Sequence, residues 1–283
     1  MHIFLIYDIV LEVVIFMNLN EFQFKKSFGQ NFIKEKNIIE KIINVSNIPD
    51  NALIIEIGPG AGSLTEKLVK TGNSVLCYEI DIRLKSYLEN KFKDNSNIDF
   101  IFSDFLTCDV SIDIKNYKYD YIYVIANLPY YITTPIINKL IEEIDVDKMV
   151  LMVQKEVGER FTASPNSRDY GSLSVFLQSY FDVKQEFLVS RNCFVPKPNV
   201  DSVIVSLTKK QNQFDIRNRE VFEKLIRDSF QFKRKTLRNN LKGYPLEQIE
   251  LILRKYNHDL SSRAEVISII EFVEISNILK NEA

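Results

Sequence analysis

A glycine-rich run near the start of the chain is the first group of residues that could do chemistry. Residues 56–63 read EIGPGAGS, so Gly58, Gly60 and Gly62 fall within five positions of a chain that has eight glycines in all. Glycines let a backbone turn tightly and approach a ligand closely, and a helix that follows them offers free N–H groups. The sequence Ser63-Leu-Thr-Glu66 matches a capping box and predicts that a helix starts there. A strand-to-helix turn with no ligand is the alternative interpretation.

Two carboxylates follow at the expected ends of the next two strands. Glu79 comes 21 residues after Gly58, and Asp104 ends the apolar run after that. A carboxylate here can accept both hydroxyls of a ribose, and a second one can accept from an adenine amino group. A dinucleotide site usually reads GxGxxG, whereas this run is GPGAG and Pro59 lacks an N–H donor. Each acid alone could be a solvated strand end, but together they favour S-adenosylmethionine, which carries ribose, adenine and a sulfonium without phosphate.

The segment Asn127-Leu128-Pro129-Tyr130 ends the fourth expected strand. The side-chain oxygen of Asn127 and the backbone carbonyl of Leu128 or Pro129 can accept the two N–H bonds of an exocyclic amine on a base. Tyr130 offers a face on which the base can stack, worth roughly 1–3 kcal/mol. Methyl transfer from a sulfonium depends on positioning and polarity and needs no strong general base. The alternative interpretation is an Asx-Pro turn with a tyrosine in the core.

The composition excludes several other kinds of chemistry. The chain has 283 residues with a formal net charge of −2, and its two histidines, His2 and His258, lie near opposite ends. A Ser-His-Asp triad or a histidine-rich metal centre is therefore not expected. Cys77, Cys108 and Cys193 form no CxxC pair, so we expect neither a disulfide framework nor a zinc site. A reducing, cytoplasmic location and no bound metal are the corresponding predictions.

The pattern of apolar residues predicts an α/β fold. Short β-branched or aromatic runs alternate with amphipathic ones, and this order is typical of crossover connections and a parallel sheet. The expected strands are Ala52–Ile57, Val75–Glu79, Ile98–Ser103, Tyr121–Ala126, Met149–Gln154, Val183–Val189 and Val200–Thr208. We expect the last two to pair as an antiparallel edge. The expected helices between strands include Leu64–Val69, Leu84–Phe92 and Ile136–Ile144, the last capped by Thr134 with Pro135 in its first turn.

After Thr208 the pattern predicts helices only. Apolar residues recur at helical spacing over 222–230 and 246–253, and Ser262 is expected to cap a last helix that carries Val266, Ile267 and Ile270. Residues 209–242 hold eleven Lys or Arg against four Asp or Glu. The sequence therefore predicts a methyltransferase domain over 25–208 and a small helical domain over 209–283. We expect residues 1–24 to be an N-terminal appendage of the kind that an upstream start creates, because the apolar stretch 1–16 is too short to span a bilayer. A membrane anchor is the less favoured alternative.

With these motifs in place, the chain resembles the rRNA adenine N6-dimethyltransferase family, in particular its branch acting on small-subunit rRNA. The resemblance runs from about Lys25 to the C-terminus through KKSFGQNFI (25–33), EIGPGAGSLT (56–65), YEID (78–81), SDFL (103–106), NLPYYITTPII (127–137), QKEVGERF (154–161), YGSLSV (170–175), FVPKPNVDSVIV (194–205) and FKRKTLRNNL (232–241). It implies a Rossmann-like seven-stranded methyltransferase sheet with a small all-helical C-terminal domain. It also implies dimethylation of two adjacent adenines in the 3′-terminal hairpin of small-subunit rRNA, on a pre-30S ribosomal particle, by a monomer.

The resemblance assigns roles to further residues. It implies cofactor contacts from Asn31 and Ile33 besides Gly58, Glu79, Asp104 and Asn127, and a stack of Phe194 on the second face of the target adenine. Without the family context, Asn31 could cap a helix near Glu35 and Phe194 could belong to the core. RNA contacts are expected from a set of basic residues, which could otherwise be merely solvated: Lys25, Lys26, Lys233, Arg234, Lys235 and Arg238.

Other functions stay open at this point. A sister branch of the same family methylates large-subunit rRNA, although FKRKTLRNNL favours the small-subunit branch. A non-catalytic assembly or transcription factor on the same fold is a different class of protein, and the intact GPGAG and NLPY motifs count against it. A DNA adenine methyltransferase usually carries two consecutive prolines where this chain has Leu128-Pro129.

Overall fold

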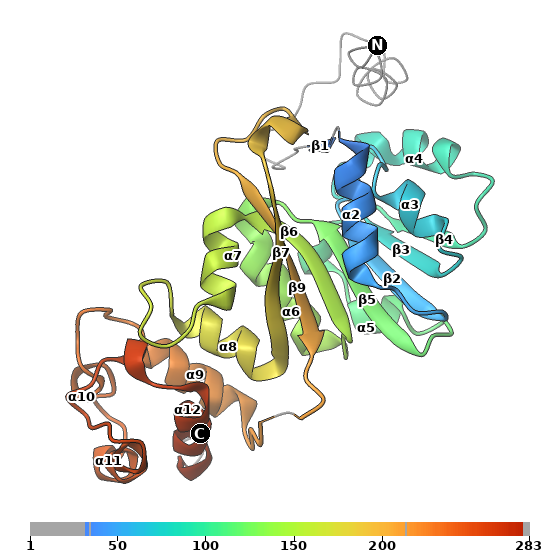
Figure 1. The fold of residues 1–283 in the computed structure, drawn as a ribbon. Helices are drawn as coiled ribbons and strands as arrows, with labels where there is room; N and C mark the ends of the chain where they lie inside the picture. The colour runs from blue at the N-terminus through green and yellow to red at the C-terminus, as the bar shows by residue number, and fades with distance from the viewer. Residues whose placement is uncertain (1–31, 34, 213, 280–283) are drawn as a thin grey trace. The chain divides into compact units, whose positions relative to one another are not determined.

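The structure is a computed structural model that describes residues 32–33, 35–212 and 214–279. Two sheets run through these residues (Figure 1). Their strands are β1 Phe32–Ile33, β2 Ala52–Ile57, β3 Ser74–Tyr78, β4 Ile98–Ile101, β5 Tyr121–Asn127, β6 Lys148–Gln154, β7 Phe181–Val189, β8 Phe194–Val195 and β9 Ser202–Lys209. The predicted appendage over 1–24, together with Lys25, Lys26 and Asn31, lies outside the described residues.

The main sheet has the strand order β4-β3-β2-β5-β6-β9-β7. The pairs β4–β3, β3–β2, β2–β5 and β5–β6 are parallel, and β9 runs antiparallel to β6. The strands β9 and β7 are neighbours at one edge, as expected for the last two strands. This arrangement confirms the α/β class and the seven-stranded sheet. The order reverses between β2 and β5, because the chain builds outward from β2 to β4 and then returns to add β5 on the other side.

Helices follow the strands of the sheet and form the C-terminal part. They are α2 Lys36–Ser46, α3 Thr65–Val69, α4 Lys85–Lys91, α5 Val110–Asp113, α6 Thr133–Glu143, α7 Lys155–Thr162, α8 Ser172–Tyr180, α9 Arg219–Ser229, α10 Leu237–Asn240, α11 Leu246–Lys255 and α12 Ile269–Ile278. Figure 1 shows α2 in front of the main sheet and α6 behind it. With both faces covered, every residue of β2 is buried, which is the expected state of a central parallel strand.

The described chain divides into two compact units. The first comprises residues up to Lys155 and Gln185–Thr208, and the second comprises Glu156–Lys184 and the residues from Lys209 onward. The expected boundary at Thr208 coincides with one of these crossings. The structure differs from the expected division in that α7 and α8 group with the C-terminal helices. The phenol of Tyr170, in the segment before α8, shows why: it is fully buried and donates a 3.0 Å hydrogen bond to the carbonyl of Ile267.

The helices of the second unit bury the apolar faces that their periodicity predicts. Phe222 and Leu225 of α9 are buried, as are Ile249 and Leu253 of α11. The predicted cap of the last helix is wrong, because residues 264–266 form a short 3-10 turn and α12 begins only at Ile269.

The N-cap of α12 is Ser268, whose hydroxyl lies 2.6 Å from Glu271 Oε2. The backbone N–H of Ser268 donates to the same oxygen at 2.9 Å. Ser268 and Glu271 thus form the Ser-x-x-Glu capping box of α12. Ser262 and Glu265 have the same spacing, but residues 264–266 form only a short 3-10 turn. Ile270, expected on the apolar face, is 40% exposed in consequence.

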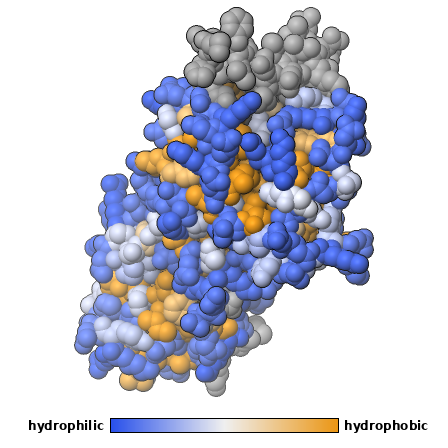
Figure 2. Space-filling model, turned by 45° about the vertical axis from the view of Figure 1, so that its right-hand side comes forward, coloured by the Kyte–Doolittle hydropathy of each residue, from blue (hydrophilic) through white to orange (hydrophobic). Residues whose placement is uncertain are grey.

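The surface is largely hydrophilic on the face drawn in Figure 2, with hydrophobic residues showing in patches between the polar ones. Among the described residues, no helix is both long and apolar enough to cross a membrane.

Candidate functional site

The glycine turn after β2 adopts backbone angles that favour glycine. Gly58, Gly60 and Gly62 have φ values of 76°, 56° and 74°, which side-chain-bearing residues rarely adopt. A Cβ on Gly58 would meet nothing within 4 Å, whereas one on Gly62 would stand 2.8 Å from the ring of Phe92. Gly58 therefore faces open space that a ligand can use, and Gly62 allows close packing against the helix α4.

The predicted capping box after this turn is wrong. The chain continues to turn through Leu64, and α3 begins at Thr65 without a side-chain cap. The hydroxyl of Ser63 is buried and has no hydrogen-bond partner in the part of the chain that the structure describes. Glu66 instead forms an ion pair with Lys91 at 2.7 Å. Tertiary contacts thus decide how the helix starts here, in place of the local motif.

Glu79 closes the glycine turn, as its position after β3 predicts. Its Oε2 accepts a 3.0 Å hydrogen bond from the backbone N–H of Gly60, and its Oε1 accepts a 2.8 Å hydrogen bond from the backbone N–H of Asp81. The carboxyl is 4% exposed, and this burial raises its pKa, an effect that the backbone donors partly offset. Each carboxylate oxygen has room for a second donor. Glu79 can therefore accept ribose hydroxyls while it keeps the turn in place.

Sequence reasoning missed the role of Glu56, the residue two before Gly58. Its carboxyl is 2% exposed, and its Oε2 accepts a 2.6 Å hydrogen bond from the hydroxyl of Thr65. The thiol of Cys77, opposite Glu56 on β3, approaches the same oxygen at 3.6 Å. Burial raises the pKa of Glu56 to about 7. The first residue of the EIGPGAGS motif was the available signal, but the sequence could not show that Thr65 and Cys77 converge on it.

Asp104 lies just beyond the end of β4 and caps a short 3-10 turn. Its Oδ1 accepts a 3.0 Å hydrogen bond from the backbone N–H of Leu106. The backbone N–H of Glu79 donates to the carbonyl of Ile101, the last residue of β4, at 3.0 Å. The structure thus brings Glu79 and Asp104 to neighbouring strand ends at the same edge of the sheet, as predicted.

Asn127 is the last residue of β5, and the register places it level with the glycine turn. Ile55 of β2 pairs with Val124 of β5. Gly58 comes three residues after Ile55, and Asn127 comes three residues after Val124. The strand order reverses between these two strands. In open α/β sheets, ligands bind in the crevice outside the carboxyl ends of the strands at such a reversal. The residues predicted to bind the cofactor and the NLPY segment therefore lie where the fold offers a binding crevice.

The residues after Asn127 are held in a tight turn. The carbonyl of Pro129 accepts a 3.2 Å hydrogen bond from the backbone N–H of Ile132, and the Thr133 hydroxyl lies 3.4 Å from the same oxygen. This carbonyl is engaged by the turn, which favours the Leu128 carbonyl as the second acceptor for a target amine. The expected helix cap at Thr134 is wrong, because α6 starts one residue earlier at Thr133, next to Ile132.

Tyr130 is fixed by a residue that sequence reasoning did not single out. Its hydroxyl lies 2.7 Å from the hydroxyl of Ser202, the fully buried first residue of β9. The pKa of Tyr130 is raised, mainly by burial of the phenol. The ring therefore has a fixed orientation in the turn that follows Asn127. Ser202 belongs to the motif FVPKPNVDSVIV, but only the sheet brings it to Tyr130.

Ile33 and Phe194, which the family resemblance singled out, pair with each other. They stand opposite one another in the two-stranded sheet of β1 and β8. Ile33 is 6% exposed and Phe194 is 2% exposed, and both belong to the hydrophobic core of the first unit. The structure thus gives Phe194 a packing role, and its stacking on a target base stays a prediction.

The basic residues with predicted RNA contacts lie between α9 and α10 and in α10 itself. Lys233, Arg234 and Lys235 are exposed in the loop, and Arg238 is exposed in α10, 4.0 Å from Glu250. In the described part of the chain, no group of three His, Cys, Asp or Glu side chains could hold a metal ion.

The residues around the turn fit S-adenosylmethionine. Gly58 leaves open space, Glu79 has acceptor capacity for hydroxyl groups, and one oxygen of Asp104 is engaged by its own turn. The buried carboxyl of Glu79 makes this crevice unsuited to a pyrophosphate and suited to a cationic nucleoside. When bound, S-adenosylmethionine supplies an electrophilic methyl group.

Comparison with known proteins points the same way. The family model described as "Ribosomal RNA adenine dimethylase" matches residues 21–281. A "Ribosomal RNA small subunit methyltransferase A" of Streptococcus thermophilus is 42% identical over 270 residues, 92% of this chain and 93% of that protein. One from Streptococcus pneumoniae is 42% identical over 271 residues, with the same coverage.

Solved structures agree in fold. A dimethyladenosine transferase from Plasmodium falciparum superposes with a TM-score of 0.72 at 27% identity, covering 87% of this chain and 97% of that one. The 23S rRNA methyltransferase ErmE superposes with a TM-score of 0.67 at 23% identity, covering 87% of this chain and 98% of that one. At this identity the similarity shows the fold alone. With 42% identity over nearly the whole chain and a family match from residue 21 to 281, the chain belongs to the ribosomal RNA adenine dimethylase family and is an S-adenosylmethionine-dependent rRNA methyltransferase.

Proposed function

We propose that the enzyme dimethylates the N6 amino groups of two adjacent adenines in the 3′-terminal hairpin of small-subunit (16S) rRNA, on a pre-30S particle during ribosome biogenesis. The observation that carries the chemistry is the register of β2 and β5, because it sets Asn127 beside the glycine turn at the reversal of strand order. The names of the 42% identical relatives support the small subunit as the source of the substrate.

The proposed roles of the site residues follow from their places. Asn127 Oδ1 and the Leu128 carbonyl accept the two N–H bonds of the target amine and hold its lone pair towards the methyl donor. The ring of Tyr130 stacks on the adenine, and its hydrogen bond to Ser202 keeps the ring in that position. Pro129 holds the turn through its carbonyl. These groups position an in-line displacement, for which no strong base is needed.

The cofactor contacts are proposed for Gly58, Gly60, Glu79, Asp104 and Asn127. The further contacts from Asn31 and Ile33, and the stack of Phe194 on the base, stand as proposals from the family resemblance. We assign catalysis to residues 25–208 and much of the rRNA contact to 209–283. Lys25, Lys26, Lys233, Arg234, Lys235 and Arg238 are the proposed phosphate contacts.

The enzyme is further proposed to act as a monomer in the cytoplasm. Its three cysteines are free thiols, which suits a reducing compartment. Light scattering at micromolar concentration tests the monomer, and a dimer at these concentrations would contradict it.

The test uses small ribosomal subunits that lack the modification, incubated with methyl-labelled S-adenosylmethionine. We expect label on two adenines of the 3′-terminal hairpin with the unaltered enzyme. Asn127→Ala is expected to lower the rate of methylation by about 10²–10³-fold, the typical cost of losing one such polar contact, while particle binding stays within about twofold. Asn95→Ala, a change at an exposed turn before β4, is the matched control and should leave the rate unchanged.

Two results would count against the proposal. Label on free large-subunit rRNA, with none on small subunits, would assign the enzyme to the sister activity. Methylation by Asn127→Ala at the unaltered rate would show that the acceptor of the target amine lies elsewhere.

A further inference from the structure

The loop between α9 and α10 exposes an aromatic ring among positive charges. Residues 231–235 are all exposed, and Phe232 has 56% of its surface exposed. A single exposed apolar side chain is common on proteins and needs no explanation by itself. Phe232 differs because three consecutive cations follow it in the same exposed loop, Lys233, Arg234 and Lys235.

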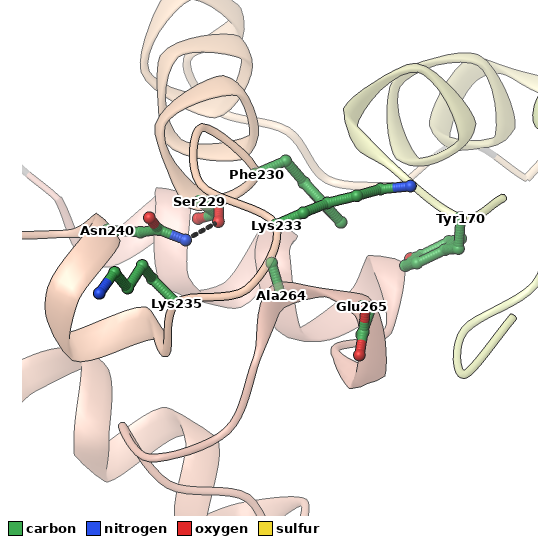
Figure 3. A pocket seen from close by; sticks show the side chains of 8 residues that line it. All are labelled: Tyr170, Ser229, Phe230, Lys233, Lys235, Asn240, Ala264 and Glu265. Atoms are coloured by element: carbon green, nitrogen blue, oxygen red, sulfur yellow. Dashed lines mark hydrogen bonds between the residues drawn. The ribbon is translucent and has the colours of Figure 1, made fainter. Parts of the chain in front are cut away.

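The loop is held in one conformation by a buried side chain. The Nδ2 of Asn240, which is 8% exposed, donates to the carbonyl of Ser229 at 2.6 Å and to that of Phe232 at 3.3 Å. The backbone N–H of Lys235 also donates to the Phe232 carbonyl, at 2.8 Å. Figure 3 shows the bond from Asn240 to Ser229 and the side chains of Lys233 and Lys235 leaving the loop on opposite sides. Phe232 therefore sits on a preformed turn.

The other end of the loop is fixed as well. The backbone N–H groups of Leu237 and Arg238 donate to the carbonyls of Ser262 and Leu260 at 2.8 and 3.0 Å. A surface that is ordered before binding loses less conformational entropy when its partner arrives. The geometry is thus that of a prepared contact surface.

The three cations of this loop form no ion pair with a carboxylate of the residues that the structure describes. Several other basic residues of the same unit do pair with carboxylates: Lys210 with Asp182, Arg219 with Glu223 and Lys224 with Asp228. Within the described ranges, Lys233, Arg234 and Lys235 form no ion pair with a carboxylate, although Lys233 Nζ donates to the carbonyl of Arg168 at 3.1 Å. Their charge is available for an anionic partner.

We infer that Phe232 stacks on an unpaired base of the small-subunit rRNA, while Lys233, Arg234 and Lys235 contact the phosphates on either side. This inference rests on the proposed function, which supplies an RNA as the partner. Every base has a face on which an aromatic ring can stack, and aromatic rings interleaved with cations are the usual means of holding single-stranded nucleic acid. The charge of the loop favours RNA over an apolar protein surface, because packing against such a surface would remove three cations from water.

The test measures the binding of the full-length enzyme to unmodified small subunits over a range of salt concentrations. Phe232→Ala is expected to weaken binding roughly 5- to 150-fold, and Phe232→Tyr to bind within about twofold of the unaltered enzyme, because tyrosine keeps the stacking face. The slope of log K against log salt should not change in either variant. Lys233→Gln should instead lower that slope by about one, since it removes a phosphate contact.

A matched control comes from another exposed apolar residue of the same unit. Leu251 in α11 is 67% exposed, and Leu251→Ala is expected to bind as the unaltered enzyme does. Equal binding by Phe232→Ala, in an enzyme whose unaltered form binds and methylates the particles, would overturn the inference and leave the proposed function intact. An unaltered enzyme that methylates only large-subunit rRNA would overturn both.

The nature of the partner is tested by a photoreactive side chain. Benzoylphenylalanine placed at position 232 should crosslink to rRNA when the complex is irradiated. Crosslinks to ribosomal protein alone would overturn the stacking inference and assign the ring to a protein contact.

Discussion

The hydroxyl of Thr65 donates a 2.6 Å hydrogen bond to Oε2 of Glu56. The bond joins the end of β2 to the first residue of α3 and so spans the glycine turn between them. It lies in the core, where both partners are almost fully buried. A buried polar pair of this kind fixes geometry, because breaking it leaves an unsatisfied group away from water.

Glu56 is expected to make the stability of the enzyme depend on pH. Burial raises its pKa from 4.5 to about 7, so the folded chain holds more protons than the unfolded chain between these values. Stability contributed by the protonated form is complete below about pH 4.5 and falls as the pH rises through 7. Glu56→Gln keeps an acceptor for Thr65 and removes the titration. From pH 5 to pH 8, the free energy of unfolding of Glu56→Gln should rise relative to that of the unaltered enzyme by up to about 3 kcal/mol, measured by urea unfolding at both pH values.

Glu247→Gln, at an exposed position of α11, is the control. It should leave the free energy of unfolding unchanged at both pH 5 and pH 8. Identical pH dependence in Glu56→Gln and the unaltered enzyme would show that Glu56 does not titrate in this range.

The two ends of the glycine turn should respond differently to alanine. Gly62→Ala combines a strained φ with a Cβ only 2.8 Å from Phe92, and we expect it to lower the free energy of unfolding by more than about 3 kcal/mol. Gly58→Ala adds strain of about 1–2 kcal/mol and places a methyl in the ligand space, so it should also weaken cofactor binding measured by calorimetry.

Gly72→Ala is matched to Gly58→Ala, because its φ is 83° and its Cβ would also meet nothing within 4 Å. It should cost similar stability and leave cofactor affinity unchanged. Equal loss of affinity in both variants would mean that strain, and not the ligand space, is responsible.

Tyr130 and Ser202 should act as a unit. Tyr130→Phe and Ser202→Ala each remove the 2.7 Å hydrogen bond. Both variants keep an aromatic ring at position 130. We expect kcat/KM to fall about 2- to 10-fold in each, corresponding to roughly 0.5–1.5 kcal/mol for one hydrogen bond. The double variant should lose little more than either single one, because both remove the same contact. Additive losses would argue that the two hydroxyls act separately.

Asn240 should support both the fold of the second unit and RNA binding. Asn240→Ala removes the donors to Ser229 and Phe232, and we expect it to lower the free energy of unfolding by about 1–3 kcal/mol and to weaken binding to small subunits. Asn239→Ala, at the exposed neighbouring position, should do neither. Full RNA affinity in a folded Asn240→Ala enzyme would show that the loop needs no such support.

Much of the fold could be predicted because burial on both faces of a parallel sheet leaves long apolar runs. The expected strand Ala52–Ile57 coincides with β2, and the others differ by a few residues at their ends. Helix starts were less predictable. Ser63, Thr134 and Ser262 each look like caps, but α3, α6 and α12 begin elsewhere. Capping preferences are worth about 1 kcal/mol, and packing of a whole helix outweighs them.

The sequence by itself determined which candidate residues gather at one edge of the sheet, since GPGAG, Glu79, Asp104 and NLPY lie at consecutive strand ends and parallel strands bring their carboxyl ends together. Only the tertiary structure decided which side chains hold those residues in place. The deciding contacts are hydrogen bonds between residues 8 to 72 positions apart in the sequence: Thr65 with Glu56, Ser202 with Tyr130, and Asn240 with the carbonyl of Phe232. Such contacts depend on the register and packing of separate elements, which no local pattern encodes.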